Sequence, residues 1–183
     1  VRGNYGSPIV ANAANELART MQAQRQYVKA QELLENAIDK VAAQDKIQLW
    51  LTLGDNYFLQ NQFSQAKQTY LQLSTIPQEI DAVYFYRLGL VNKQLNDVAS
   101  ALAQFEHVLA DTTIHRGISA YAAVEYAELL ALDNRAVEGV RYLQDYVAPI
   151  SSTVRRNMIF MAIANISENY LNDYAKKKKN YNA

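Results

Sequence analysis

The chain has 183 residues, half of them hydrophobic, with only six Gly and three Pro, which favours a helical protein with short connections. Its 18 Lys and Arg balance 18 Asp and Glu, which argues against a general nucleic-acid binder because such proteins carry a basic face. The absence of Cys excludes disulfides and thiolate chemistry, and no apolar run approaches the roughly 18 residues that a membrane span needs.

The predicted elements begin after residues 1–7, which have no periodicity and are expected to form a leader. Ser7 is the expected N-cap of a first helix over residues 8–23. A short polar turn leads to a second helix over residues 27–42. In both segments apolar residues recur at three- and four-residue spacing, which predicts two amphipathic helices.

The segment from Ile47 to Pro77 shows this pattern most clearly. A Gly within a helix costs about 1 kcal/mol relative to Ala, so the place of Gly54 among apolar residues predicts that two helices approach closely there. Pro77 is expected to end the second helix of the pair. The apolar stripes are formed by Trp50, Leu53, Gly54, Tyr57 and Phe58 in the first helix and by Phe63, Ala66, Tyr70 and Leu73 in the second.

Two further helix pairs and one final helix follow. The third pair is separated from the fourth by a linker over residues 111–116, and the fourth pair extends over residues 118–147. The final helix is expected to be capped by Ser151 or Ser152 and to extend to about Tyr174.

Alanines mark the same place in each second helix. Ala30, Ala66, Ala101 and Ala136 follow one another at intervals of 36, 35 and 35 residues. Gly54 and Gly89 are also 35 residues apart, and each follows a Leu. A shared period of this length predicts an array of helical hairpins.

These residues resemble the tetratricopeptide repeat, whose unit is a helical hairpin of about 34 residues. The second unit carries the family's signature at Trp50, Leu53, Gly54, Tyr57, Ala66, Tyr70 and Pro77. The resemblance implies an all-α fold, an α-solenoid of about four hairpins with a C-terminal capping helix. The expected organisation is a leader at 1–7, an array at 8–149 with units of about 11–46, 47–81, 82–116 and 117–150, a capping helix at 151–175 and a basic tail at 176–183.

In this family the first helices line a concave groove that usually takes an extended peptide or a helix of another protein. The resemblance therefore places candidate partner-binding residues on the first helices: Asn15, Arg19, Gln22, Gln48, Leu51, Asp55, Phe58, Leu59, Tyr86, Leu90, Lys93, Gln94, Tyr121, Glu125 and Glu128. An exposed apolar floor for a ligand is expected from Leu51, Phe58, Tyr86, Leu90 and Tyr121. The alternative is that the terminal helix covers these residues or that they pack between repeats.

Other kinds of site are set aside. A clamp for a carboxylate tail is rejected because the acidic Asp55 would stand at its centre and repel the ligand. His107 and His115 are the only histidines, and two ligands are too few for a tight metal site. No nucleophile motif or phosphate loop occurs. Neither a metal nor a cofactor is expected, and the chain is predicted not to be an enzyme.

The leading hypothesis is a non-enzymatic scaffold that binds a peptide or helix of another protein in the groove, with no nucleic acid and no membrane span. One alternative is an RNA-binding array that resembles pentatricopeptide repeats, and another is a spacer or oligomerisation module of a larger envelope protein, which leaves a homo-oligomer open. The many Gln, Asn and Tyr residues, the lack of Cys and a first residue other than Met favour the bacterial periplasm or cell envelope over the cytoplasm.

Overall fold

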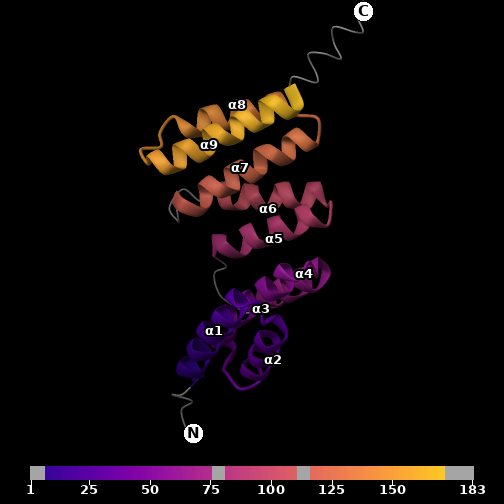
Figure 1. Ribbon diagram of the computed structural model, residues 1–183, viewed down its shortest axis with the longest axis vertical. Helices are drawn as coiled ribbons and strands as arrows, with labels where there is room; N and C mark the ends of the chain where they lie inside the picture. Colours follow the sequence, from indigo (N-terminus) through magenta and orange to yellow (C-terminus); the bar gives the residue numbers. More distant parts are fainter. Residues whose placement is uncertain (1–6, 76–80, 111–115, 172–183) are drawn as a thin grey trace, which may run out of the picture. The chain divides into compact units, whose positions relative to one another are not determined.

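The computed structural model describes residues 7–75, 81–110 and 116–171, and all regular secondary structure in these ranges is helical (Figure 1). The chain divides into two compact units at Leu95 and Asn96. We call residues 1–95 unit 1 and residues 96–183 unit 2. Pro77 and His115 lie outside the described residues.

Unit 1 is built from antiparallel helical hairpins. Helices α1 and α2 pack as one hairpin and α3 and α4 as the next, while α3 also packs against both α1 and α2 and α4 packs against α5 (Figure 1). Its helices are α1 (Ser7–Ala23), α2 (Tyr27–Ile38), α3 (Lys46–Leu59), α4 (Phe63–Leu71) and α5 (Ala82–Gln94), with 3-10 turns η1 (Ala43–Asp45) and η2 (Gln72–Thr75).

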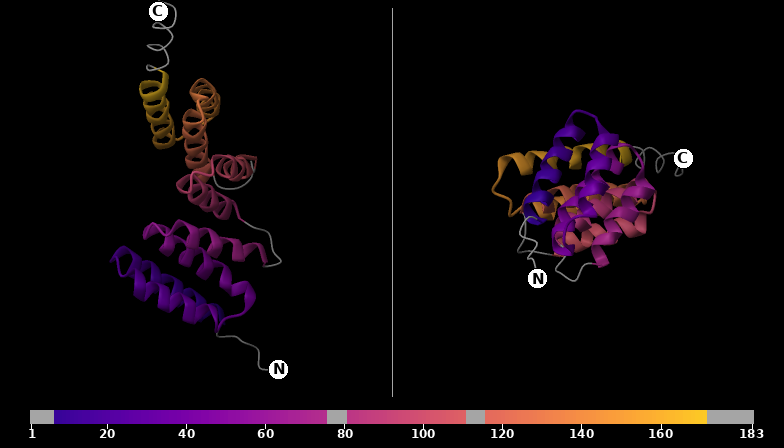
Figure 2. Two further views of the ribbon diagram at one scale, coloured as in Figure 1. Left: turned by 90° about the vertical axis from the view of Figure 1, so that its right-hand side faces the viewer. Right: turned by 90° about the horizontal axis from the view of Figure 1, so that it is seen from below.

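Unit 2 continues the same hairpin pattern. Helices α7 and α8 form a hairpin, α6 packs against α7, and α9 packs against both α7 and α8 (Figure 2). The helices are α6 (Val98–Ala110), α7 (Arg116–Leu132), α8 (Ala136–Val147) and α9 (Thr153–Ile166), and α9 is followed by a π-helical turn, η3 (Ser167–Leu171).

The periodic alanines form the core, as the sequence predicts. Ala30, Ala66 and Ala101 are 0% exposed and Ala136 is 7% exposed. Each lies in the second helix of a hairpin, where the absence of a longer side chain lets the neighbouring helix approach. The prediction of an all-α array of hairpins is therefore confirmed.

Two helix ends differ from the sequence predictions. Ser7 is not an N-cap, because it lies inside α1, where its hydroxyl donates to the Asp45 carboxylate and accepts the Ala42 backbone N–H. These two bonds attach the start of α1 to the segment that precedes α3. The second helix ends at Ile38 rather than at Ala42, because a turn and η1 follow it.

Four residues in the hairpin turns have a left-handed backbone. Arg25, Asn61, Asn96 and Asn134 have φ of 59°, 60°, 59° and 62°, and they lie 36, 35 and 38 residues apart. After three of them the next backbone N–H returns to a carbonyl five residues earlier: Gln26 to Met21, Gln62 to Tyr57 and Arg135 to Leu130. This 6→1 bond is typical of a Schellman helix end, which favours Gly or Asn at the left-handed position. The repeat therefore extends to the conformation of its turns.

Arg25 is the one member of this set with a side chain that suits the left-handed region poorly. We expect Arg25→Asn to raise the free energy of unfolding by about 0.5–1 kcal/mol, because Asn tolerates this backbone better than Arg. Urea unfolding followed by circular dichroism measures the change. The reciprocal variant, Asn61→Arg, should lose a similar amount, and equal stability of both variants and the parent would contradict the explanation.

Candidate partner-binding surfaces

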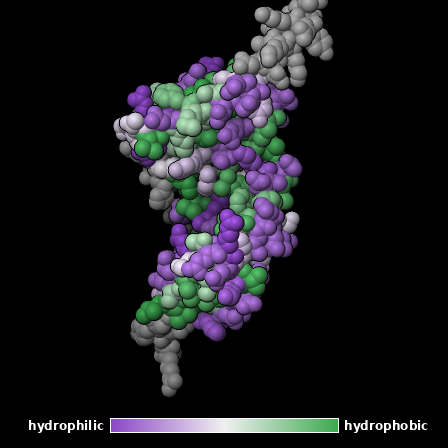
Figure 3. All heavy atoms as spheres, viewed as in Figure 1, coloured by the Kyte–Doolittle hydropathy of each residue, from purple (hydrophilic) through white to green (hydrophobic). Residues whose placement is uncertain are grey.

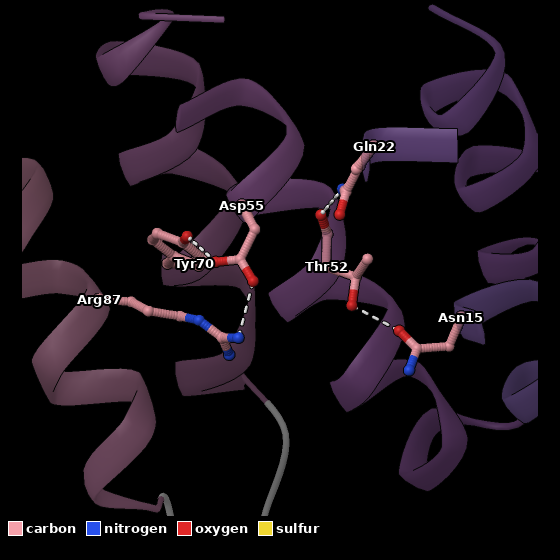
Figure 4. Close-up of polar contacts among 6 residues, drawn as sticks. All are labelled: Asn15, Gln22, Thr52, Asp55, Tyr70 and Arg87. Carbon is pink, nitrogen blue, oxygen red and sulfur yellow. Dashed lines mark hydrogen bonds and ion pairs between the residues drawn. The ribbon is translucent and has the colours of Figure 1, made fainter. Parts of the chain in front are cut away.

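The Asp55 carboxylate on α3 joins three helices of unit 1. Its Oδ1 accepts a hydrogen bond from the Tyr70 hydroxyl on α4 at 2.6 Å, and its Oδ2 accepts from the Arg87 Nη2 on α5 at 2.7 Å (Figure 4). The side chains of Arg87 and Asp55 are 24% and 32% exposed, so the ion pair is partly shielded from solvent. Charge-assisted hydrogen bonds in such a setting are shorter and stronger than neutral ones.

The protonation of this cluster follows from its burial. Tyr70 is 1% exposed, and burial together with the neighbouring Asp55 charge raises the pKa of its hydroxyl. The hydroxyl therefore remains a donor at neutral pH. Burial also raises the pKa of the Asp55 carboxyl, and the Arg87 guanidinium and the Tyr70 hydroxyl oppose that shift.

Asp55 does not present an unmatched negative charge to a ligand, although the rejection of a carboxylate clamp from the sequence rests on that charge. In the structure Arg87 on α5 neutralises it. Repulsion by Asp55 therefore no longer argues against an anionic ligand. The side chain is also committed to holding α3, α4 and α5 together.

A second polar cluster joins α3 to α1. The Thr52 hydroxyl donates to the Asn15 Oδ1, and the Gln22 Nε2 donates to the Thr52 carbonyl oxygen at 2.9 Å (Figure 4). Asn15 and Thr52 are 7% and 4% exposed. Asn15 and Gln22 were candidate groove residues, but their hydrogen bonds attach one first helix to the next. Asn56, which is fully buried, likewise donates from Nδ2 to the Tyr27 carbonyl oxygen at 3.0 Å.

The apolar floor predicted for unit 1 is only partly exposed. Leu51 is 5% exposed and belongs to the core, so its expected exposure was wrong: its side chain packs inside unit 1 rather than facing solvent. Phe58 is half-buried and meets Phe63 edge-on, with ring centroids 5.4 Å apart. Arg19, Gln48 and Leu59 are exposed. Of the remaining candidates of unit 1, Gln94 is exposed, and Tyr86, Leu90 and Lys93 are half-buried.

In unit 2 the predicted partner-binding residues lie on α7, and one of them lines a groove. Tyr121 is 54% exposed, and Glu125 and Glu128 are half-buried. Glu128 lines a shallow groove between α7 and α9, and we call this the α7–α9 groove. The groove is lined by Val124, Glu128, Val154, Asn157, Met158, Met161, Ala162 and Asn165.

The α9 side of this groove was not among the residues predicted from the sequence. Val154 is 79% exposed and Met161 is 66% exposed, whereas the final helix was expected to serve only as a cap. A signal was available, because α9 carries apolar residues on more than one side. The helix therefore both covers α7 and α8 and offers apolar surface of its own.

Clusters of metal-ligating side chains and membrane-spanning helices are both absent from the part of the chain that the structure describes. Within residues 7–75, 81–110 and 116–171 no three His, Cys, Asp or Glu side chains gather where they could hold a metal ion. None of the helices in these same ranges has the length and hydropathy to cross a membrane.

The arrangement defines a helical-repeat protein, and comparison with known proteins specifies the repeat. No protein-family model and no curated protein sequence matches the chain. Solved structures match closely in shape. A Podosopora anserina protein described as a kinesin light chain with nearly identical TPR-like repeats has a TM-score of 0.76 at 19% identity over 93% of this chain and 92% of its own.

Two further solved structures show the same fold. A tetratricopeptide repeat protein from Parabacteroides merdae has a TM-score of 0.68 at 17% identity, over 94% of this chain and 65% of its own. YrrB, described as a TPR protein with an unusual peptide-binding site, has a TM-score of 0.60 at 14% identity, over 90% of both chains. The chain therefore has the tetratricopeptide-repeat fold, as its sequence motifs predict.

Proposed function

We propose that this chain is a non-enzymatic protein-interaction scaffold that binds a segment of another protein on the surface of its first helices. The observation that carries the proposal is the α7–α9 groove, where Val154 and Met161 expose most of their apolar side chains beside the half-buried Val124 and Met158. Exposed apolar residues gathered in one concave place are typical of interaction sites.

The chemistry of the groove suits an apolar peptide or one face of an amphipathic helix. Burying one large apolar side chain stabilises a complex by about 1.5–3 kcal/mol before the cost of ordering the partner. The thioether of methionine adapts to different apolar shapes, and Met158 and Met161 both line the groove. Asn157 and Asn165 lie among these residues and can donate to and accept from a peptide backbone.

Unit 1 offers a second set of contacts for a partner. The exposed Arg19, Gln48 and Leu59 and the half-buried Phe58 and Tyr86 belong to this set. YrrB supports peptide binding as a use of this fold, since its structure is described as having a peptide-binding site. We infer that Leu51 and Asp55 act indirectly, by packing and by holding α4 and α5.

Peptides selected from a displayed random library on the full chain test the proposal. We expect Met161→Asp to weaken the binding of selected peptides by about tenfold or more, because a charge would replace a buried apolar contact. Fluorescence anisotropy with labelled peptides measures the affinity. Val137→Asp is the matched control, since Val137 on α8 is also 66% exposed but does not line the groove. If neither Met161→Asp nor the double variant Phe58→Ala/Tyr86→Ala reduces binding, the proposed surface is wrong.

A further inference from the structure

Helix α9 is apolar on two opposite sides. Ile159, Ala162 and Ile166 point into the core of unit 2 and are 0%, 4% and 1% exposed. On the other side Phe160 is 47% exposed. A helix that is hydrophobic all round is normally covered on all sides, and the described elements that pack most against α9 are α7, α8 and η3 (Figure 2). Among the described residues, Phe160 therefore marks an outer side that is left exposed.

One row of residues runs along this outer side. Arg156, Phe160 and Ala164 follow one another at four-residue spacing on α9, and Glu168 continues the row in η3. All four are exposed. We call them the α9 row. Space-filling atoms show hydrophobic residues exposed among hydrophilic ones on the viewed face of unit 2 (Figure 3).

The α9 row is complementary to its own reversed order. A cation lies at one end and an anion at the other, and a large ring lies beside a small residue in the middle. The Arg156 guanidinium already lies over the Phe160 ring, 5.9 Å from its centroid, which aims its charge along the row. Among the described residues Glu168 has no ion-pair partner.

We infer that the α9 row is a docking surface for a second copy of this chain, packed antiparallel about a two-fold axis that crosses the outer side of α9 midway between Phe160 and Ala164. Residues equally distant from the axis meet in such a pair. Phe160 of each copy then packs on Ala164 of the other, because the methyl side chain of Ala164 leaves space for the ring. Arg156 of each copy meets Glu168 of the other. Packing of four-residue rows against one another is the commonest mode of helix contact in globular proteins.

The charge order selects this arrangement over its alternatives. In a parallel pair Arg156 would face Arg156 and Glu168 would face Glu168, which repels. Val154 and Met158 of the α7–α9 groove lie on a neighbouring row of α9, whereas Met161 borders Phe160 and Ala164. The inference rests on the residues of the α9 row and not on the proposed peptide binding, so either can fail without the other.

Charge reversal with rescue tests the inference. The molar mass of the full chain is measured by sedimentation equilibrium over a range of concentrations. The parent chain is expected to form a dimer, and Arg156→Glu should weaken its association by about tenfold, since two attractive pairs become repulsive. The double variant Arg156→Glu/Glu168→Arg should restore association. Val137→Asp, on α8 and outside the α9 row, should leave it unchanged.

Three results would overturn the inference. A parent chain that remains monomeric at every concentration has no such dimer. A dimer that Arg156→Glu does not weaken is formed by another surface. If the single variant weakens association and the double variant does not restore it, Arg156 and Glu168 do not meet. Circular dichroism of each variant separates loss of association from loss of folding, and all four residues of the row are exposed.

Discussion

Gly54→Ala should lower the free energy of unfolding by about 1–3 kcal/mol, although alanine is the better helix former. A Cβ at this position would lie 2.1 Å from the Tyr70 Cε1 and 2.5 Å from its Cδ1. The Tyr70 ring cannot move away cheaply, because it is 1% exposed and its hydroxyl is bonded to Asp55. The ring would have to shift, and the Asp55 cluster would shift with it.

Urea unfolding followed by circular dichroism measures the effect of Gly54→Ala. Gly117→Ala is the matched control, because a Cβ at Gly117 has no other atom within 4 Å. That control is expected to be neutral or slightly stabilising. The variant Gly54→Ala/Tyr70→Leu should cost less than the sum of its two single changes, since the smaller side chain makes room. A Gly54→Ala variant as stable as the parent would show that the ring is not fixed.

Gly139→Ala is expected to destabilise unit 2 by about 1–3 kcal/mol or more, because the added Cβ would clash with backbone rather than with a side chain. Its Cβ would lie 2.6 Å from the Ala127 carbonyl oxygen and 3.3 Å from the Ala127 carbonyl carbon. These are backbone atoms of α7, so no rotamer change relieves the clash. Helices α7 and α8 would have to move apart along their whole contact.

Thermal unfolding and the binding of selected peptides report on Gly139→Ala together. The melting temperature of Gly139→Ala should fall, whereas that of the control Gly117→Ala should equal that of the parent. Since α7 forms one wall of the α7–α9 groove, peptide affinity should also fall in the fraction that remains folded. If the melting temperature of Gly139→Ala equals that of the parent, the close approach of α7 and α8 is not required for stability.

Features that recur in several hairpins could be predicted from the sequence. The alanines at a period of 35 or 36 residues are buried as expected, and Gly54 meets a ring of the following helix. Burial and close packing depend on a position within the repeat, so one hairpin informs the others. Arg19, Gln48 and Leu59 on the first helices are exposed, and their contact with a partner stays a prediction.

Features that occur once could not be predicted in this way. Gly139 has no counterpart at the equivalent place in the other hairpins, where Leu33, Thr69 and Gln104 stand. The Arg87 partner of Asp55 lies 32 residues away on the next hairpin, and periodicity does not pair side chains. The apolar outer side of α9 could not be predicted either, because a terminal helix has no later repeat with which to compare it.

Both polar clusters of unit 1 include a residue of α3, and this determines which helices of the unit can open locally. Thr52 holds α1 and Asp55 holds α5, so neither outer helix is bonded through these clusters to anything but α3 and α4 (Figure 4). Local opening should therefore release α1 or α5 while α3 stays in place. Amide hydrogens of α3 would then exchange with solvent most slowly in unit 1. A partner lying across the three helices would slow exchange at both edges without changing the conformation that it binds.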